Sequence, residues 1–299
     1  MKNIFLRTLE TTVKKSAIII SVVTALLCGL MLVNLAEITK GSFVSISNEL
    51  LSYQNLFIFL ALDGFLLISM IASSTSGIIS SEVHEGTFRL LVTKPNSRSE
   101  ILTGKLTGNF VGLVVLMLLS LFTYFSVIVL SRNIDSNIAK MLLSYLPCYI
   151  LYGIVVIVVV GSVACLLSCI CNKKLAAFLP IFALIIVIMA VIPMFRIVGQ
   201  FSNSGQLPPL IDINYHFGLM FKQCVEVFGK SIPQSEALGY FTNIFINAFS
   251  DCDITRMSWP KQVLTDNQTL SMMAVMAIYI VLSALMLLLS YRIIKRKDV

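Results

Sequence analysis

The sequence TGNFVGLVVLMLLSLFTYFSVIVL, residues 107–130, contains no charged side chain. A helix of about 20 mostly apolar residues crosses the roughly 30 Å hydrocarbon core of a bilayer, and it pairs every backbone polar group within itself. Residues 107–130 therefore predict a membrane-spanning helix. Five further stretches have the same character, so the predicted spans are 16–36, 56–76, 107–130, 142–170, 175–195 and 270–291.

The composition of the 299 residues agrees with this prediction. Apolar residues make up 57% and charged residues 12% of the chain, against roughly 45–50% and 25% in soluble proteins. A water-soluble globule is therefore excluded, and we expect one all-α integral membrane domain over residues 1–299. The net charge of +7 lies at the ends of the apolar stretches, which indicates membrane topology rather than a nucleic-acid partner.

The distribution of basic residues predicts the direction of the six spans. Lysine and arginine gather before span one, between spans two and three, between spans four and five, and after span six. Such segments remain preferentially in the cytoplasm, so we expect both termini to be cytoplasmic. Span four is overlong and contains Pro147 near its start, which predicts a tilt or a bend there.

Two regions outside the spans show helical periodicity. In residues 1–15 an apolar stripe predicts a helix lying along the inner leaflet, with a basic tail as the alternative. Residues 196–268 predict two amphipathic helices joined around Pro233, which either dip into the outer leaflet or cap the spans. The alternative for this region is a small external subdomain.

Residues 80–105, SSEVHEGTFRLLVTKPNSRSEILTGK, are the most informative segment, and we call it the knob. Glu85 precedes Arg89 by four residues, a spacing that favours an ion pair on a helix. Pro95 ends this helix, and Ser97 with Glu100 forms a capping box that starts the next one. Gly86 suggests a kink or the close approach of another backbone. The knob is thus either a rigid force-transmitting element or an ordinary capped loop.

The knob resembles the signature of type-2 ABC transporter permeases, which lies between the second and third spans as it does here. The matching residues are Glu82, Glu85, Gly86, Thr87, Leu90, Leu91, Pro95, Ser97, Arg98, Ile101 and Lys105. The resemblance implies that the knob is a coupling helix seated on a cytoplasmic ABC ATPase. The residues it implies for this coupling are Glu82, Glu85, Gly86, Thr87, Arg89, Pro95 and Arg98.

The same resemblance implies a second permease subunit, identical or different, and a bacterial cytoplasmic membrane as the location. It also implies export of an amphiphilic substrate, such as an antimicrobial peptide, a drug-like compound or a lipid-linked molecule. In this hypothesis the external helices form a gate that includes Phe217, Phe221, Phe241 and Phe245. One alternative is a secondary transporter or channel that works without an ATPase. Another is a non-transporting membrane sensor or scaffold that uses the same knob to hold a partner.

The chain lacks a phosphate-binding G-x-x-x-x-G-K-[ST] motif, because Gly104-Lys105 is followed by Leu106. ATP and Mg²⁺ are therefore expected on a separate ATPase chain, and we expect neither a catalytic residue nor a cofactor or metal site on this one. Cys165, Cys169 and Cys171 form no CxxC pair. They are predicted to be small apolar residues.

Several other residues invite specific interpretations. Gly104, Gly108 and Gly112 share a helix stripe that favours close helix packing, either within the subunit or between subunits. Asp63 lies inside span two, where it is either structural or part of a polar pathway with Ser73 and Ser76. Cys224 and Cys252 could form a disulfide if their compartment is oxidising. Asn267-Gln268-Thr269 matches a glycosylation acceptor, but in the bacterial membrane that the resemblance implies the match has no meaning.

Overall fold

The computed structural model describes residues 2–39, 41–87, 97–195, 210–232 and 270–296. These residues form helices and turns, and no strand occurs among them. Six helical stretches are long and apolar enough to cross a membrane: Lys15–Ile38, Phe43–His84, Arg98–Leu130, Ser136–Ile170, Lys174–Phe195 and Met272–Arg296. Each contains or nearly coincides with one predicted span, so the predicted all-α membrane fold is confirmed.

The elements follow one another along the chain with few long connections inside the described ranges. The first half contains α1 (Lys2–Thr12), α2 (Lys15–Ile38), α3 (Phe43–Phe57), η1 (Ile58–Leu66), α4 (Leu67–Thr75), α5 (Ser80–His84) and α7 (Arg98–Leu130). The second half contains α8 (Ser136–Leu143), α9 (Leu146–Ile170), α10 (Lys174–Ile186), η2 (Val187–Val191), α12 (Ile213–Val227) and α14 (Met272–Arg296). The two η elements are π-helical stretches inside the second and fifth spans.

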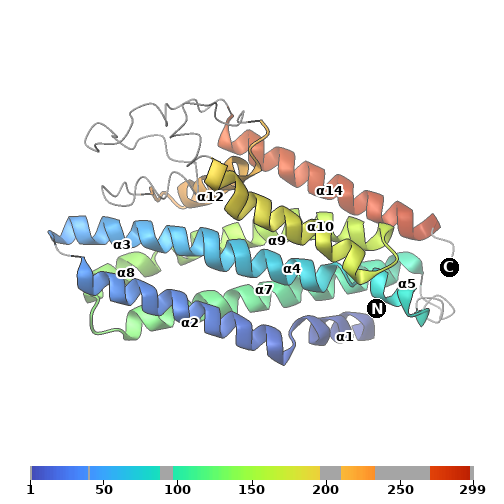
Figure 1. The fold of residues 1–299 in the computed structure, drawn as a ribbon, viewed down its shortest axis with the longest axis horizontal. Coiled ribbons are helices and arrows are strands. Elements are labelled where there is room, and N and C mark those ends of the chain that lie inside the picture. Colours follow the sequence, from blue (N-terminus) through green and yellow to red (C-terminus); the bar gives the residue numbers. More distant parts are fainter. Residues whose placement is uncertain (1, 40, 88–96, 196–209, 233–269, 297–299) are drawn as a thin grey trace.

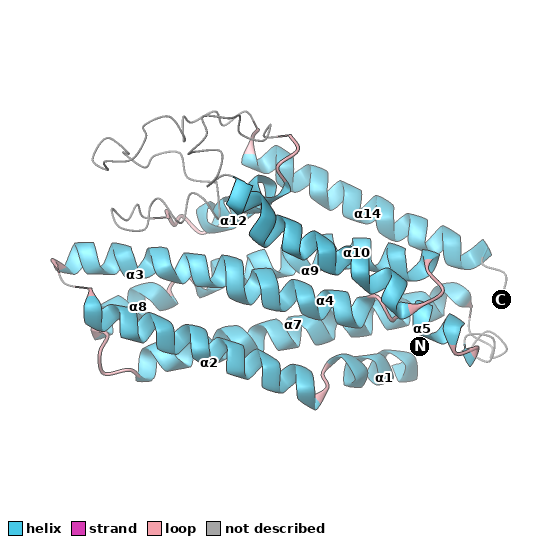
Figure 2. Ribbon diagram, viewed as in Figure 1, coloured by secondary structure: helices cyan, strands magenta, loops and turns pink. Residues whose placement is uncertain are grey.

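The spans lie roughly side by side in one elongated bundle (Figures 1 and 2). Lys2 and Arg296 lie at the same end of the bundle, which we call the terminal end. The opposite end carries α8 and α12, and we call it the distal end. The central helix is α9, which packs against α4, α7, α10, α12 and α14. By contrast, α14 exposes an apolar surface, with Leu285 and Leu288 half or more exposed, as expected for a helix facing lipid.

The predicted bend in span four is a complete break between α8 and α9. The helix α8 ends at Leu143, and Pro147 stands in the first turn of α9, where a missing backbone N–H costs no hydrogen bond. The buried Gln54 of α3 reaches this break: its side-chain amide donates to the backbone carbonyl of Leu142 at 3.1 Å and to the Tyr149 hydroxyl at 2.9 Å. The break is thereby supplied with polar partners from a neighbouring span.

The N-terminal segment forms the predicted helix. It runs beside the first turns of α7 and in the same direction (Figure 1). A Cβ added to Gly108 would lie 2.6 Å from the Phe5 carbonyl oxygen, and one added to Gly112 would lie 2.9 Å from Thr12. The physical reason is that two glycines open a groove on α7 that receives α1.

The ends of the bundle differ in charge. At the terminal end, basic side chains outnumber acidic ones among the described residues, whereas at the distal end the two kinds nearly balance. The basic residues of the terminal end are Lys2, Arg7, Lys14, Lys15, Arg98, Lys105, Lys173, Lys174, Arg292, Lys295 and Arg296. This asymmetry is the pattern from which the cytoplasmic side was predicted.

Candidate functional site

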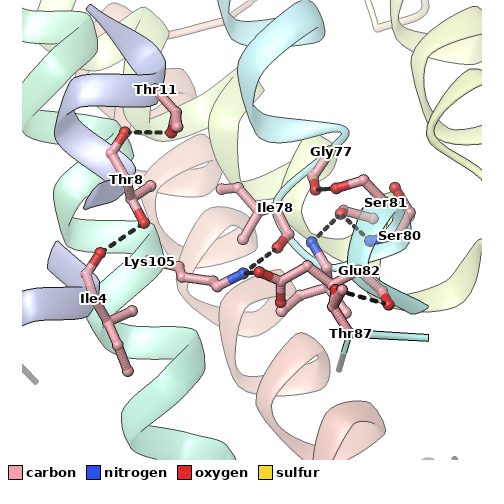
Figure 3. A network of polar contacts seen from close by, with 12 residues as sticks. Ile4, Thr8, Thr11, Gly77, Ile78, Ser80, Ser81, Glu82, Thr87 and Lys105 are labelled. Atoms are coloured by element: carbon pink, nitrogen blue, oxygen red, sulfur yellow. Dashed lines mark hydrogen bonds and ion pairs between the residues drawn. The ribbon is translucent and has the colours of Figure 1, made fainter. Parts of the chain in front are cut away.

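The described part of the knob is held by a lysine of the third span (Figure 3). The ammonium group of Lys105, on α7, forms an ion pair with Glu82 of α5 and donates to the backbone carbonyl of Ile78 at 3.0 Å. The side chain of Lys105 is 10% exposed and that of Glu82 is 22% exposed, so the pair is largely shielded from water. We call this three-residue contact the clasp, and it fixes α5 to the first turns of α7.

The start of α5 is held by a second span. The hydroxyl of Ser168, fully buried on α9, accepts hydrogen bonds from the backbone N–H groups of Ile79 at 3.0 Å and Ser80 at 3.3 Å. The first N–H groups of a helix have no partner within the helix, so this hydroxyl caps α5 from outside. The knob is therefore attached to both α7 and α9.

Gly86 ends α5 by its backbone conformation. Its φ is +71°, in the left-handed region that glycine adopts without strain, and an added Cβ would meet nothing within 4 Å. Among the described residues, no other backbone approaches Gly86 closely enough to require a glycine, so its conformation is what the structure shows. The chain turns here because a left-handed residue terminates the helix.

The second half of the knob begins with the predicted capping box. The Ser97 hydroxyl accepts from the backbone N–H of Glu100 at 3.2 Å, while the Glu100 carboxylate accepts from the Ser97 backbone N–H at 3.1 Å. From this cap, α7 runs for 33 residues, about 50 Å at 1.5 Å per residue. It is thus about 20 Å longer than the hydrocarbon core, and its first turns can project beyond the membrane.

Between the two capped helices the knob presents an exposed tip. His84, Glu85 and Gly86 are exposed at the end of α5, and the Thr87 hydroxyl donates to the Glu82 carbonyl at 3.4 Å. Arg89 and Pro95 lie outside the described residues, so the Glu85–Arg89 ion pair remains a prediction. The tip therefore carries an exposed carboxylate, that of Glu85, and the helix from which it projects is anchored by the clasp.

A second polar contact lies one helical turn beyond the clasp. The Asn109 amide of α7 donates to the Thr75 hydroxyl of α4 at 2.8 Å and accepts from the Thr12 hydroxyl of α1 at 2.9 Å. All three side chains are buried. Because Gly108 and Gly112 also face α1, the glycine stripe packs at least in part within one subunit; Gly104 is buried in the same stripe.

At the distal end, α12 is buried among the spans on nearly all sides. The Phe221 ring contacts the rings of Phe59, Tyr149 and Tyr152 at centroid distances of 5.5, 6.1 and 5.0 Å. Phe217 contacts Tyr279 of α14 at 6.2 Å. The first external helix was predicted either to dip into the outer leaflet or to cap the spans. The structure shows the second arrangement, because α12 inserts between the spans.

The other half of the predicted external hairpin cannot be compared with the structure. Phe241, Phe245 and Cys252 lie outside the described residues, so neither their part in a gate nor the disulfide is tested. Cys224 itself is fully buried in α12. Burial, followed by the nearby Cys148 and Asp63, raises the pKa of its thiol to about 12.

The three residues suggested for a polar pathway differ in burial. Asp63 and Ser76 are fully buried, whereas Ser73 is exposed. The neighbouring Ser74 hydroxyl donates to the backbone carbonyl of Met70 at 2.8 Å, one turn earlier on its own helix. The polar pathway through these residues therefore remains a prediction.

Sequence reasoning missed the partners that hold the knob. Glu82 and Lys105 both belong to the signature, but their separation of 23 positions does not predict a contact between them. The usable signal was the lysine itself, because a basic residue at the entrance of an apolar span needs an anionic partner or water. Asn109, four residues later on α7, carried a similar signal, whereas the capping role of Ser168 had none.

Comparison with protein families agrees with the geometry. A model described as an ABC-2 family transporter protein matches residues 10–299. The chain belongs to the ABC-2 family of transporter proteins. A comparison with curated proteins gives no match.

Membership of the ABC-2 family identifies the chain as a multi-pass membrane permease. Permeases of this family are transport subunits that associate with ABC ATPase subunits and are not catalytic by themselves. Among the described residues, no group of three or more His, Cys, Asp or Glu side chains is placed to hold a metal ion.

Proposed function

We propose that this ABC-2 permease is the membrane subunit of an exporter whose knob transmits the motion of a separate ATPase. ATP and Mg²⁺ bind to that ATPase. When the ATPase subunits close, they displace the tip around Glu85. The observation that carries the proposal is the clasp: Lys105 connects α5 to α7 directly, so a force on the tip moves a spanning helix. A loop without such contacts would absorb the displacement.

The remaining parts of the proposal concern the surroundings of the permease. The basic terminal end faces the cytoplasm of a bacterial cell, and a second permease subunit pairs with this chain around the transport path. Cargo is amphiphilic, because the spans offer an apolar interior with few charges. Phe217 and Phe221, with Phe241 and Phe245, form the gate at the distal end.

The coupling test uses a charge reversal that leaves the fold intact. Glu85 is exposed and belongs to the tip, so Glu85→Arg should not disturb packing. The matched control is Glu49→Arg on α3, at the distal end. With the co-purified ATPase in liposomes, we expect Glu85→Arg to abolish stimulation of ATP hydrolysis and Glu49→Arg to leave it unchanged. Equal activity of both variants would contradict the coupling role of the knob.

The direction of transport is tested with inside-out membrane vesicles and fluorescent amphiphiles. An exporter accumulates its cargo inside such vesicles when ATP is added, and the accumulation should depend on the ATPase. Accumulation that persists without the ATPase would instead indicate a secondary transporter. Binding of the ATPase without any transport would indicate a sensor or scaffold.

A further inference from the structure

Asp63 is a carboxylic acid buried in the middle of the second span. It lies in η1, a nine-residue π-helical stretch, and its side chain is 0% exposed. Neither carboxyl oxygen has a hydrogen-bond partner within the described part of the chain. The salt bridge found in that part joins Lys105 to Glu82, so Asp63 has no cationic partner there.

The neighbours of Asp63 enclose it from several elements. On α9, a Cβ added to Gly153 would lie 3.3 Å from an Asp63 carboxyl oxygen and would collide with the Met117 sulfur of α7. The Tyr152 ring of the same helix stacks on Phe59 at 5.9 Å, and its hydroxyl has no hydrogen-bond partner among the described residues. The surroundings are thus packed tightly and contain too few polar partners for an ion.

The groups around Asp63 that can titrate are neutral when protonated. Tyr149 and Tyr152 of α9 and Cys224 of α12 lie within electrostatic range of the carboxyl group. The neighbouring α2 and α7 contribute the buried Cys28 and Tyr124, and α3 contributes Glu49 and Tyr53, which are also neutral when protonated. By contrast, α4 and η2 carry no titratable side chain. Among the described residues, no lysine, arginine or histidine pairs with Asp63 to balance a negative charge.

An ionised carboxylate in such a position would be buried without solvation, counter-ion or hydrogen bond, which is strongly unfavourable. A metal or organic cation would need room and several oxygen ligands, and the packing at Gly153 leaves little. A proton needs neither room nor further ligands. We propose that Asp63 is a proton-binding site of the permease and that α12 stays in its packed position only while this proton is bound.

The link to α12 follows from what covers the site. Phe221 of α12 packs on both Phe59 and Tyr152, the two rings that flank Asp63 along η1 and α9. Cys224, one turn later on α12, is fully buried and close to the same carboxyl group. Release of the proton would place a negative charge under these residues, and hydration of that charge requires α12 to move away. This inference goes beyond the proposed transport function and does not depend on it.

Infrared spectroscopy of the purified permease in lipid nanodiscs tests the site directly. The C=O stretch of a protonated carboxyl group differs from the bands of a carboxylate. At neutral pH we expect this band in the wild type, its loss in Asp63→Asn and a shifted band in Asp63→Glu. Asp135→Asn, which removes an exposed carboxyl but keeps a good helix cap, should retain the band. Absence of the band from the wild type, or its presence in Asp63→Asn, would overturn the proposal.

Labelling of Cys224 by a maleimide tests the link to α12. The labelled cysteine is identified by peptide mass spectrometry, at neutral and at alkaline pH, in the wild type and in Asp63→Asn. We expect labelling of Cys224 to rise more steeply with pH in the wild type, because only there can residue 63 lose a proton. Equal rises would show that α12 does not respond to Asp63, whatever the outcome of the transport experiments.

Discussion

The knob and the distal core around α12 are built by different physical means. At the terminal end, α5 is held by hydrogen bonds and one ion pair from Lys105 and Ser168. At the distal end, α12 is held chiefly by aromatic rings, with Phe221 in contact with three others. Polar contacts are directional and few, whereas ring packing spreads over a large apolar area.

The difference suggests a division of labour between the two regions. A few directional contacts fix the short helix α5 to the long helices α7 and α9 at definite points, which is the arrangement that the proposed coupling requires. A broad apolar contact stabilises the bundle and excludes water from its interior. The first kind of region is expected to be sensitive to single polar substitutions, and the second to loss of volume.

The largest loss of stability is expected from Phe221→Ala in the distal core. Removal of a buried ring that contacts three others costs about 3–5 kcal/mol. Thermal unfolding of the detergent-purified permease measures the effect. Phe122→Ala is the matched control, because that ring is 53% exposed on α7 and its loss should be nearly neutral. A similar loss in both variants would show that the aromatic contacts of α12 do not stabilise the bundle.

The next largest effect is expected from Lys105→Ala, which breaks the clasp. It leaves the shielded carboxylate of Glu82 and the Ile78 carbonyl without their partner, at a cost of about 3 kcal/mol. Unlike Phe221→Ala, it should also reduce ATPase stimulation in folded protein. The exposed Lys140→Ala serves as control, and exchange of the two charges (Glu82→Lys with Lys105→Glu) should restore part of the coupling. Full ATPase stimulation in Lys105→Ala would show that the clasp is not needed for coupling.

A smaller effect is expected from Gly108→Ala, at the groove that receives α1. The new Cβ would lie 2.6 Å from the Phe5 carbonyl oxygen, and such overpacking costs about 1–3 kcal/mol. We expect α1 to loosen and trypsin to cleave faster after Lys14 and Lys15. Gly41→Ala is the control, since its nearest neighbour would be at an ordinary 3.4 Å. Unchanged cleavage would show that α1 adapts without leaving α7.

The smallest effect is expected from Gly86→Ala at the end of α5. A left-handed conformation costs a residue with a Cβ roughly 1–2 kcal/mol. Gly86→Asn should cost less, because asparagine adopts this conformation more readily. Thermal unfolding and ATPase stimulation of both variants measure the difference. If alanine proves as good as asparagine here, the positive φ of Gly86 is not what shapes the tip.

Much of the fold could be predicted from the sequence because its signals are local. A span is recognised from the length of an apolar stretch, and the capping box from two residues three positions apart, Ser97 and Glu100. The break at Pro147 follows from the ring of proline itself. Each of these features depends on interactions between residues that are close in the chain.

The candidate site could be predicted only in part. The position of the knob between spans two and three followed from its signature, and Gly86 was recognised as a special position. The clasp could not be predicted, because the partner of Glu82 depends on how α5 lies against α7. The contact of α1 with α7 could not be predicted either, because an apolar stripe fits a membrane surface as well as it fits a groove made by Gly108 and Gly112.

The sequence by itself determined that this is a membrane protein with six spans, which segments lie between them and where the basic charge accumulates. The length of an apolar stretch and the position of charges determine how the chain interacts with lipid and water, and these interactions do not depend on which helices pack together. Only the tertiary structure decided that Lys105 reaches Glu82, that Asn109 joins three helices and that α12 closes over Asp63. Those contacts join residues remote in the chain, and their distances are fixed by the packing of whole helices.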